Sequence, residues 1–175
     1  MNIKTQKLIT AAVIGALYAV LTMVLSPISY GPLQFRVSEV LCILPFFLPC
    51  TAWGLFFGCM IANLISAAGI LDIVFGSLAT LCACLCMAKL GEKGASLKNE
   101  ILACAMPVVW NGVIVGAVLC YALTDLVPWN NLVPFLVYAG QVALGELVVM
   151  FAVGLPLMRY LPKQKFFTEQ LTKLR

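Results

Sequence analysis

Long apolar segments alternate with short polar ones along the whole chain. Residues 8–25 form one apolar run, residues 40–88 form a second that carries a single charged residue, Asp72, and residues 101–158 form a third. A helix needs about 20 apolar residues to cross a bilayer, so the first run supplies one span and the longer runs supply several. Because the runs lack the alternating pattern of barrel strands, we predict that the spans are helices.

The composition also indicates an integral membrane protein. Of the 175 residues, 63% are hydrophobic and 10% are charged, and the mean hydropathy is +1.05. The sequence has no His and no glycine-rich loop followed by Lys-Ser or Lys-Thr, so we expect neither ATP hydrolysis nor a membrane enzyme. Its eight cysteines include no Cys-x-x-Cys pair. We interpret them as small apolar residues of the core, and we expect no metal or cofactor.

The basic residues divide the chain into spans. Ten of the eleven lie in three clusters, within residues 4–7, 89–98 and 159–175. Lys and Arg near membrane spans mark the cytoplasmic side, so an even number of crossings separates successive clusters. Turn-forming residues favour four crossings before the second cluster and two after it. Residues 1–175 are therefore predicted to form a single membrane domain, a six-helix bundle with both termini in the cytoplasm. The approximate helix limits are 7–26, 37–49, 52–67, 72–89, 101–123 and 132–159.

Small residues recur at fourfold spacing on three of these helices, a pattern that lets helix backbones approach closely in lipid. On the third and fifth helices, where Gly54/Gly58 and Gly112/Gly116 carry the pattern, we interpret it as packing within the bundle. On the first helix it could instead form an exposed stripe on which another membrane subunit docks. The residues of this predicted stripe are Ala12, Gly15, Ala16 and Ala19.

Polar side chains within the spans indicate a binding site, because ionisable groups are costly there and mark functional sites by default. Glu146 and Asn111 are predicted near mid-membrane, about 21 Å and 16 Å along the sixth and fifth helices. The other polar residues lie in the outer half of the bundle or in the first external loop, so we predict an outward-open pocket for a small molecule. The candidate binding residues are Gln34, Arg36, Glu39, Asn63, Asp72, Asn111, Tyr138, Gln141 and Glu146.

Structural roles are open for most of these residues. Asp72 could cap the fourth helix, Glu39 could pair with Arg36 on a helix surface, and the two Asn could form interhelical hydrogen bonds. Outer aromatic residues such as Trp129 could anchor the membrane interface or cover a ligand. Glu146 differs, because no cation of the chain is expected at its depth. It is protonated, hydrogen-bonded to a neighbour, or in contact with a ligand.

Three motifs carry a resemblance to a known family. Residues 28–39 read Ile-Ser-Tyr-Gly-Pro-Leu-Gln-Phe-Arg-Val-Ser-Glu, residues 69–80 read Gly-Ile-Leu-Asp-Ile-Val-Phe-Gly-Ser-Leu-Ala-Thr, and residues 145–149 read Gly-Glu-Leu-Val-Val. Through these motifs the chain, from about residue 8 to residue 161, resembles the QueT family. Members of this family are the queuosine-precursor S components of energy-coupling-factor (ECF) transporters.

The resemblance implies a six-helix S component of the bacterial cell membrane that binds a 7-deazaguanine (preQ0, preQ1 or queuine) at its outer face. A transmembrane scaffold subunit and two ATPase subunits would drive uptake. Ala12 and Ala16 match the Ala-x-x-x-Ala motif that docks the scaffold in S components. A stand-alone proton-coupled carrier of a small polar heterocycle, with Glu146 as its proton site, is the alternative. The sequence leaves open which deazapurine is preferred.

Overall fold

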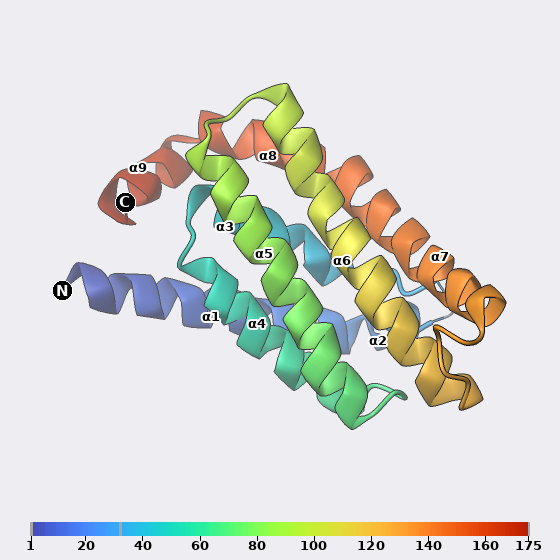
Figure 1. Cartoon of the computed structure of the whole chain (residues 1–175). Helices are drawn as coiled ribbons and strands as arrows, with labels where there is room; N and C mark the ends of the chain where they lie inside the picture. The colour runs from blue at the N-terminus through green and yellow to red at the C-terminus, as the bar shows by residue number, and fades with distance from the viewer. Residues whose placement is uncertain (1, 32, 175) are drawn as a thin grey trace.

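The computed structural model describes residues 2–31 and 33–174, which are helical along almost their whole length (Figure 1). Four helical segments are long and apolar enough to cross a membrane: Ile3–Val24, Asp72–Glu92, Leu97–Thr124 and Leu132–Lys163. Two apolar helical segments are shorter, Val37–Phe47 and Thr51–Ile65. The described residues contain no strand. The protein is therefore an all-helical membrane protein.

The helical elements follow the predicted apolar segments, with changes at their ends. In chain order they are α1 (Ile3–Val24), α2 (Ser26–Ser29), the 3-10 helix η1 (Val37–Ile43), α3 (Leu44–Phe47), α4 (Thr51–Ala62), the 3-10 turn η2 (Asn63–Ile65), the π-helix η3 (Asp72–Gly76), α5 (Ser77–Glu92), α6 (Leu97–Thr124), α7 (Leu132–Val149), the π-helix η4 (Met150–Gly154), α8 (Leu155–Tyr160), the 3-10 turn η5 (Leu161–Lys163) and α9 (Lys165–Leu174).

Side-chain caps explain why two helices begin earlier than predicted. The Asn2 side chain accepts a hydrogen bond from the Lys4 backbone N–H, so α1 begins at Ile3 rather than near residue 7. The Ser96 hydroxyl accepts one from the Asn99 backbone N–H, so α6 begins at Leu97 rather than at residue 101. Each cap satisfies a backbone donor that has no partner within the first helical turn.

Glycines and alanines bring the helices together. A side chain on Gly54 would overlap the backbone carbonyl of Ala11, and one on Gly58 would overlap that of Gly15. The α1 and α4 backbones are therefore in direct contact. Gly112 and Gly116 likewise let α6 pack closely on α7, where they face Ala143 and Ala139. The prediction that the small residues of the third and fifth predicted helices pack within the bundle is confirmed.

The same packing corrects part of the predicted docking stripe. Gly15 and Ala19 are buried on the face of α1 that packs inside the bundle, together with Ala11 and Tyr18, so they are not available to a partner. Ala12 and Ala16 belong to the next face of the helix and are exposed. Each residue of an α-helix is rotated by about 100° from the one before, so neighbouring positions of the same small-residue run face different ways.

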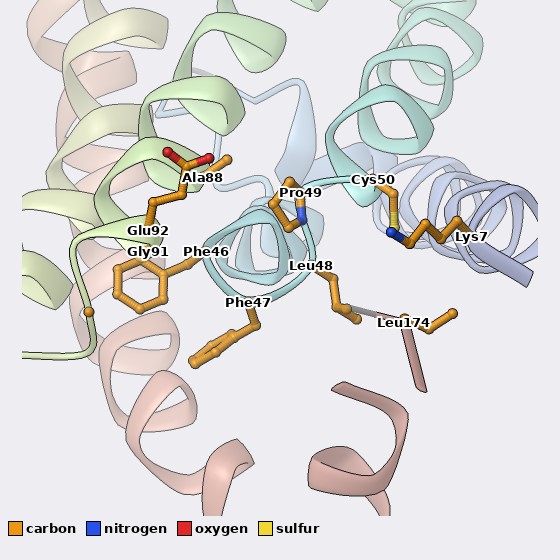
Figure 2. A pocket seen from close by; sticks show the side chains of 11 residues that line it. Lys7, Phe46, Phe47, Leu48, Pro49, Cys50, Ala88, Gly91, Glu92 and Leu174 are labelled. Carbon is orange, nitrogen blue, oxygen red and sulfur yellow. The ribbon is translucent and has the colours of Figure 1, made fainter. Parts of the chain in front are cut away.

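The two chain termini lie at the same end of the bundle (Figure 1). There α9 folds back over the bundle, and its Phe167 ring packs edge-on against Phe47 at 5.4 Å between centroids. A cavity of about 570 Å³ lies at this end between α3, the end of α5 and α9, with Lys7 and Glu92 in its lining (Figure 2). The opposite end of the bundle carries the loops between α2 and η1, between η2 and η3 and between α6 and α7 (Figure 1).

The short helix η1 occupies the centre of the structure. It contacts α1 on one side and α5, α6 and α7 on others, so five of its seven residues are buried. Its inward residues include two polar ones, Ser38 and Glu39, which are fully buried. Buried polar groups need hydrogen-bond partners within the protein, so η1 draws polar side chains from its neighbours toward the middle of the bundle.

Candidate ligand-binding site

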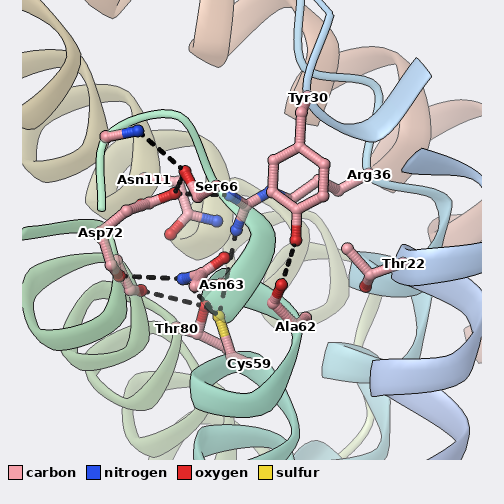
Figure 3. A network of polar contacts seen from close by, with 12 residues as sticks. Thr22, Tyr30, Arg36, Cys59, Ala62, Asn63, Ser66, Asp72, Thr80 and Asn111 are labelled. Atoms are coloured by element: carbon pink, nitrogen blue, oxygen red, sulfur yellow. Dashed lines mark hydrogen bonds and ion pairs between the residues drawn. The ribbon is translucent and has the colours of Figure 1, made fainter. Parts of the chain in front are cut away.

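A buried ion pair joins two of the three family motifs. Arg36, just before η1, is 4% exposed, and its Nη2 lies 3.2 Å from Oδ2 of the fully buried Asp72 at the start of η3. The Ser66 hydroxyl donates to the same carboxylate oxygen over 2.6 Å, and the Asn63 amide nitrogen donates to the Asp72 backbone carbonyl over 2.9 Å. Figure 3 shows these side chains converging from separate segments of the chain.

The turn between α4 and η3 places these groups together. Gly69 has a φ of +60°, a left-handed conformation that favours glycine, and it helps the chain turn back so that Asn63 and Ser66 face Asp72. Gly76 is required for a different reason, since a side chain there would overlap the Asp72 carboxylate. The motif at residues 69–80 therefore provides both the carboxylate and the space that it fills.

Tyr30 fixes the other side of Arg36. The guanidinium carbon lies 5.3 Å from the centroid of the Tyr30 ring, within cation–π distance. The phenol O–H donates to the Ala62 backbone carbonyl over 2.6 Å (Figure 3). Burial raises the pKa of Tyr30 to about 12, so the phenol keeps the proton of this hydrogen bond at neutral pH. Arg36 is thus held between an aromatic ring and a carboxylate.

The sulfur of Cys59 is also part of this network. Its Sγ lies 3.9 Å from Arg36 Nη1, 3.5 Å from the Asn63 amide nitrogen and 3.4 Å from the Thr80 hydroxyl. Sulfur is a weak hydrogen-bond acceptor, so these contacts add little binding energy. They orient the three donor groups around Cys59. The interpretation of the cysteines as apolar core residues fits the burial of Cys59 but misses its polar surroundings.

Glu39 does not pair with Arg36, so the interpretation of these two residues as a helix-surface ion pair is wrong. Arg36 turns toward Asp72 instead. Glu39 accepts hydrogen bonds from the Tyr18 hydroxyl on α1 and, over 3.0 Å, from the Cys42 thiol. Both oxygens of this predicted binding residue are therefore engaged within the protein, and Glu39 serves to connect η1 with α1.

A second polar pair lies between α6 and α7. The Asn111 amide nitrogen donates to Glu146 Oε1 over 2.8 Å, and each side chain is 2% exposed. The interpretation of Asn111 as an interhelical hydrogen-bonding residue is confirmed. A side chain at Gly145 would overlap the Leu33 backbone carbonyl, so α7 lies directly against the loop that carries Arg36. Glu146 is therefore close to the first network without belonging to it.

An open pocket adjoins the Arg36–Asp72 network. Its volume is about 410 Å³, within the range of roughly 300–1,000 Å³ that is typical of small-molecule sites. Ser66 belongs to both the pocket wall and the network. Glu146 lies about 7.5 Å along α7 from Gln141 of the wall. The pocket is lined by Tyr30, Gly31, Gln34, Ser66, Ala67, Leu119, Leu123, Tyr138 and Gln141.

Several buried polar atoms of the Arg36–Asp72 network and the Asn111–Glu146 pair have no hydrogen-bond partner among the described residues. Three are acceptors, Asn63 Oδ1, Asn111 Oδ1 and Glu146 Oε2, and one is a donor, Arg36 Nε. A buried polar atom without a partner costs about 1–3 kcal/mol, so a ligand that satisfies such atoms gains affinity. Asp72 Oδ1 is also unpartnered, but it is turned toward the backbone at Gly76.

Comparison with known proteins identifies the family. Residues 8–163 match the protein family described as QueT transporter. The chain belongs to the QueT transporter family. It is also 33% identical over 172 residues to the queuosine precursor transporter QueT of Lactococcus lactis subsp. cremoris (strain MG1363), a match that covers 92% of this chain and 95% of the relative. No solved structure matches the chain. The resemblance inferred from the three motifs is confirmed, and the protein is a membrane transport protein rather than an enzyme.

The structure brings most of the predicted residues of this QueT-family site together, in three groups. Gln34, Tyr138 and Gln141 line the pocket. The Arg36–Asp72 network and the Asn111–Glu146 pair form the other two groups. Trp129 lies apart, because it is 83% exposed and lines a separate apolar pocket.

Sequence reasoning missed two hydrogen-bonding residues, Tyr18, which is fully buried, and Ser66, which is half-buried. Tyr18 is a lone aromatic residue in an apolar helix, and nothing in its surroundings distinguishes it from a core residue. Ser66 continues the fourfold spacing of small residues that begins at Gly54 and Gly58, a pattern that indicated packing. Its place just before the motif at residues 69–80 was the signal that could have identified it.

Proposed function

We propose that this QueT-family protein is the substrate-binding S component of an ECF transporter and captures a 7-deazaguanine, a queuosine precursor such as preQ0, preQ1 or queuine. The carrying observation is an open pocket that shares Ser66 with the Arg36–Asp72 network, in which Arg36 and Asn63 have buried polar atoms without a partner. The substrate class follows from the family and from the name of the Lactococcus relative, a queuosine precursor transporter.

The chemistry of the site suits such a ligand. The edge of a guanine-like ring presents adjacent N–H donors, which match the free oxygens of Asn63, Asn111 and Glu146. The ring carbonyl can accept from Arg36 Nε, a buried nitrogen without a partner among the described residues. Tyr30 and Tyr138 in the pocket wall offer aromatic faces for the flat ring. A ligand with few donors would leave the three acceptors buried and unsatisfied.

The proposed topology is six spans with both termini in the cytoplasm. The two shorter apolar segments, Val37–Phe47 and Thr51–Ile65, would cross the membrane as tilted or locally thinned spans. The ion pair between Arg159 and Glu100, 3.0 Å apart, brings the second and third basic clusters to the same end of the bundle. That end also holds both termini (Figure 1), as the positive-inside rule requires of a cytoplasmic face. The binding pocket then opens to the outside.

Partner subunits would supply the energy, because the sequence has no ATP-binding motif. We expect a transmembrane scaffold subunit to dock on the exposed face of α1 at Ala12 and Ala16, and two ATPase subunits to complete the transporter. Small side chains let another helix approach α1 closely. Exposed apolar neighbours such as Leu8, Val13 and Val20 would enlarge the contact.

The ligand that copurifies with the detergent-solubilised protein tests the substrate class. Mass spectrometry should detect a 7-deazaguanine, and the stripped protein should bind the same compound in titration calorimetry. A copurified ligand of another chemical class, with no measurable binding of any 7-deazaguanine, would refute the proposal.

One observation favours a different function. Glu146 is a buried carboxylate that forms no ion pair with any described residue, as a proton-coupled carrier would need. Uptake by the chain alone, in proteoliposomes with a proton gradient, separates the two. An S component should bind the precursor and accumulate it only when scaffold and ATPase subunits are present with ATP. Robust accumulation by the chain alone would establish the carrier instead.

A further inference from the structure

The cavity of about 570 Å³ lies at the end of the bundle that holds both termini, and it shares no residue with the pocket proposed for the precursor. We infer that this cavity binds an anionic phospholipid, with the phosphate beside Lys7 and the upper part of an acyl chain along an apolar wall. The proposed topology places this end in the cytoplasm, so the lipid belongs to the inner leaflet.

The apolar wall comes from two parts of the chain. Phe46, Phe47 and Leu48, at the end of α3, line one side of the cavity, and Leu174 of α9 also faces it (Figure 2). A side chain at Gly91 would overlap the Phe46 backbone carbonyl, so the end of α5 lies directly against α3 and holds this wall in place. The wall gives an acyl chain an apolar surface away from water.

Lys7 supplies a positive charge at the edge of the cavity. Among the described Lys and Arg residues of the three basic clusters, Lys7 alone is half-buried, and the others are exposed. It forms no ion pair with any described residue. Figure 2 shows its amine directed toward Cys50, which also lines the cavity. A partly buried ammonium without a counter-charge favours an anionic ligand group, with which it forms charge-assisted hydrogen bonds.

The acidic residue of the lining does not cancel this charge. Glu92 is exposed and lies on the opposite side of the cavity from Lys7 (Figure 2). Two further cations are close to the Lys7 side in sequence and structure. Lys4 lies one helical turn before Lys7 on α1, and Lys173 precedes Leu174 of the lining. Basic residues near the membrane surface attract anionic lipids, at about 1 kcal/mol each.

The helix α9 favours a lipid over a soluble anion. Its Phe167, Leu171 and Leu174 pack toward the core, whereas Phe166 is 74% exposed. An exposed aromatic ring beside a basic residue, here Lys165, is typical of amphipathic helices that lie in the membrane interface. A cavity bordered by such a helix is next to lipid headgroups, which are far more concentrated there than soluble anions.

Native mass spectrometry of the detergent-solubilised full-length protein tests the inference. Phosphatidylglycerol and phosphatidylcholine with identical acyl chains are added in separate titrations, and glycerol 3-phosphate serves as the soluble anion. We expect phosphatidylglycerol to bind about fivefold or more tightly than phosphatidylcholine. Equal binding of the two lipids overturns the preference for an anion. Binding of glycerol 3-phosphate as tight as that of phosphatidylglycerol overturns the assignment to a lipid.

Three substitutions locate the site. Lys7→Gln should weaken phosphatidylglycerol binding about fivefold or more and change phosphatidylcholine binding by less than about twofold. Lys98→Gln is the matched control, because Lys98 is exposed and does not line the cavity, and it should leave both affinities unchanged. Equal effects of the two substitutions overturn the role of Lys7.

Glu92→Gln tests the sign of the ligand's charge. It removes the anion of the lining, so phosphatidylglycerol binding should stay the same or become tighter. A loss of about fivefold would show that the cavity takes a cation, which overturns the inference. Precursor binding, measured separately by titration calorimetry, should be unchanged in Lys7→Gln. The lipid site and the proposed function therefore fail independently, because each has its own ligand and measurement.

Discussion

Replacing Asp72 with Asn removes one charge from the buried ion pair and changes almost nothing else. The side chain keeps its size, and its amide oxygen can still accept the Ser66 hydrogen bond. Arg36 keeps its position at 4% exposure but loses its counter-charge. Because this cation is far from solvent, the substitution isolates the effect of leaving it unpaired.

The expected magnitude follows from the burial of both partners. Removing one partner of a buried ion pair lowers the free energy of unfolding by about 3–5 kcal/mol. Because Asn keeps a hydrogen-bond acceptor, we expect Asp72→Asn to lie at the lower end, at about 3 kcal/mol. We also expect the affinity for the precursor to fall about tenfold or more, because Asp72 holds both Arg36 and Ser66, and Ser66 lines the pocket. Thermal unfolding in detergent measures the first effect and titration calorimetry measures the second.

The double variant Arg36→Gln/Asp72→Asn provides the control. It removes both charges, so no unpaired cation remains, and it should unfold at a higher temperature than Asp72→Asn alone. Its affinity should stay low, because the Arg36 donor is lost. If Asp72→Asn is as stable as the unaltered protein and binds the precursor equally well, the ion pair has neither of the roles described above.

Three further substitutions test other parts of the structure. Ala16→Trp should block copurification with the scaffold subunit while precursor binding stays unchanged, and normal copurification would contradict the docking face. Gly54→Leu should prevent folding or lower the unfolding temperature sharply, since the new side chain meets the Ala11 backbone; an unaltered melting curve would show that the helices are not in contact. Tyr18→Phe removes the hydroxyl that Glu39 accepts from, and should destabilise the protein by about 1–3 kcal/mol in thermal unfolding without changing the scaffold interaction. An unchanged unfolding temperature would indicate that Glu39 finds another donor.

Apolar runs identified the helical segments because burial in lipid depends on local composition. The runs could not reveal that η1 is a 3-10 helix, since its conformation depends on the helices packed around it. The docking stripe was partly misassigned for a similar reason. Spacing shows which residues share a face of α1, but it does not show which face packs on α4.

The members of the site were largely predictable and their pairing was not. A charged or amide side chain in an apolar run stands out in the sequence, as Glu146 and Asn63 do. The partner of each side chain could not be predicted in this way. Closeness in sequence suggested Glu39 as the partner of Arg36, whereas the fold places Asp72, 36 positions away, beside it. Tyr18 has a partner that its sequence context does not indicate, since an aromatic residue in a hydrophobic helix carries no sign of the carboxylate that it contacts.

The contact between α1 and α4 has a mechanical consequence. Gly54 and Gly58 leave no gap between the two backbones, so α1 cannot roll about its own axis without its carbonyl groups colliding with α4. Ala12 and Ala16 therefore keep one fixed orientation relative to the rest of the bundle. A substitution on α4 that forces the two helices apart would therefore rotate or shift the exposed α1 face that carries Ala12 and Ala16. It would do so although every residue of that face is unchanged.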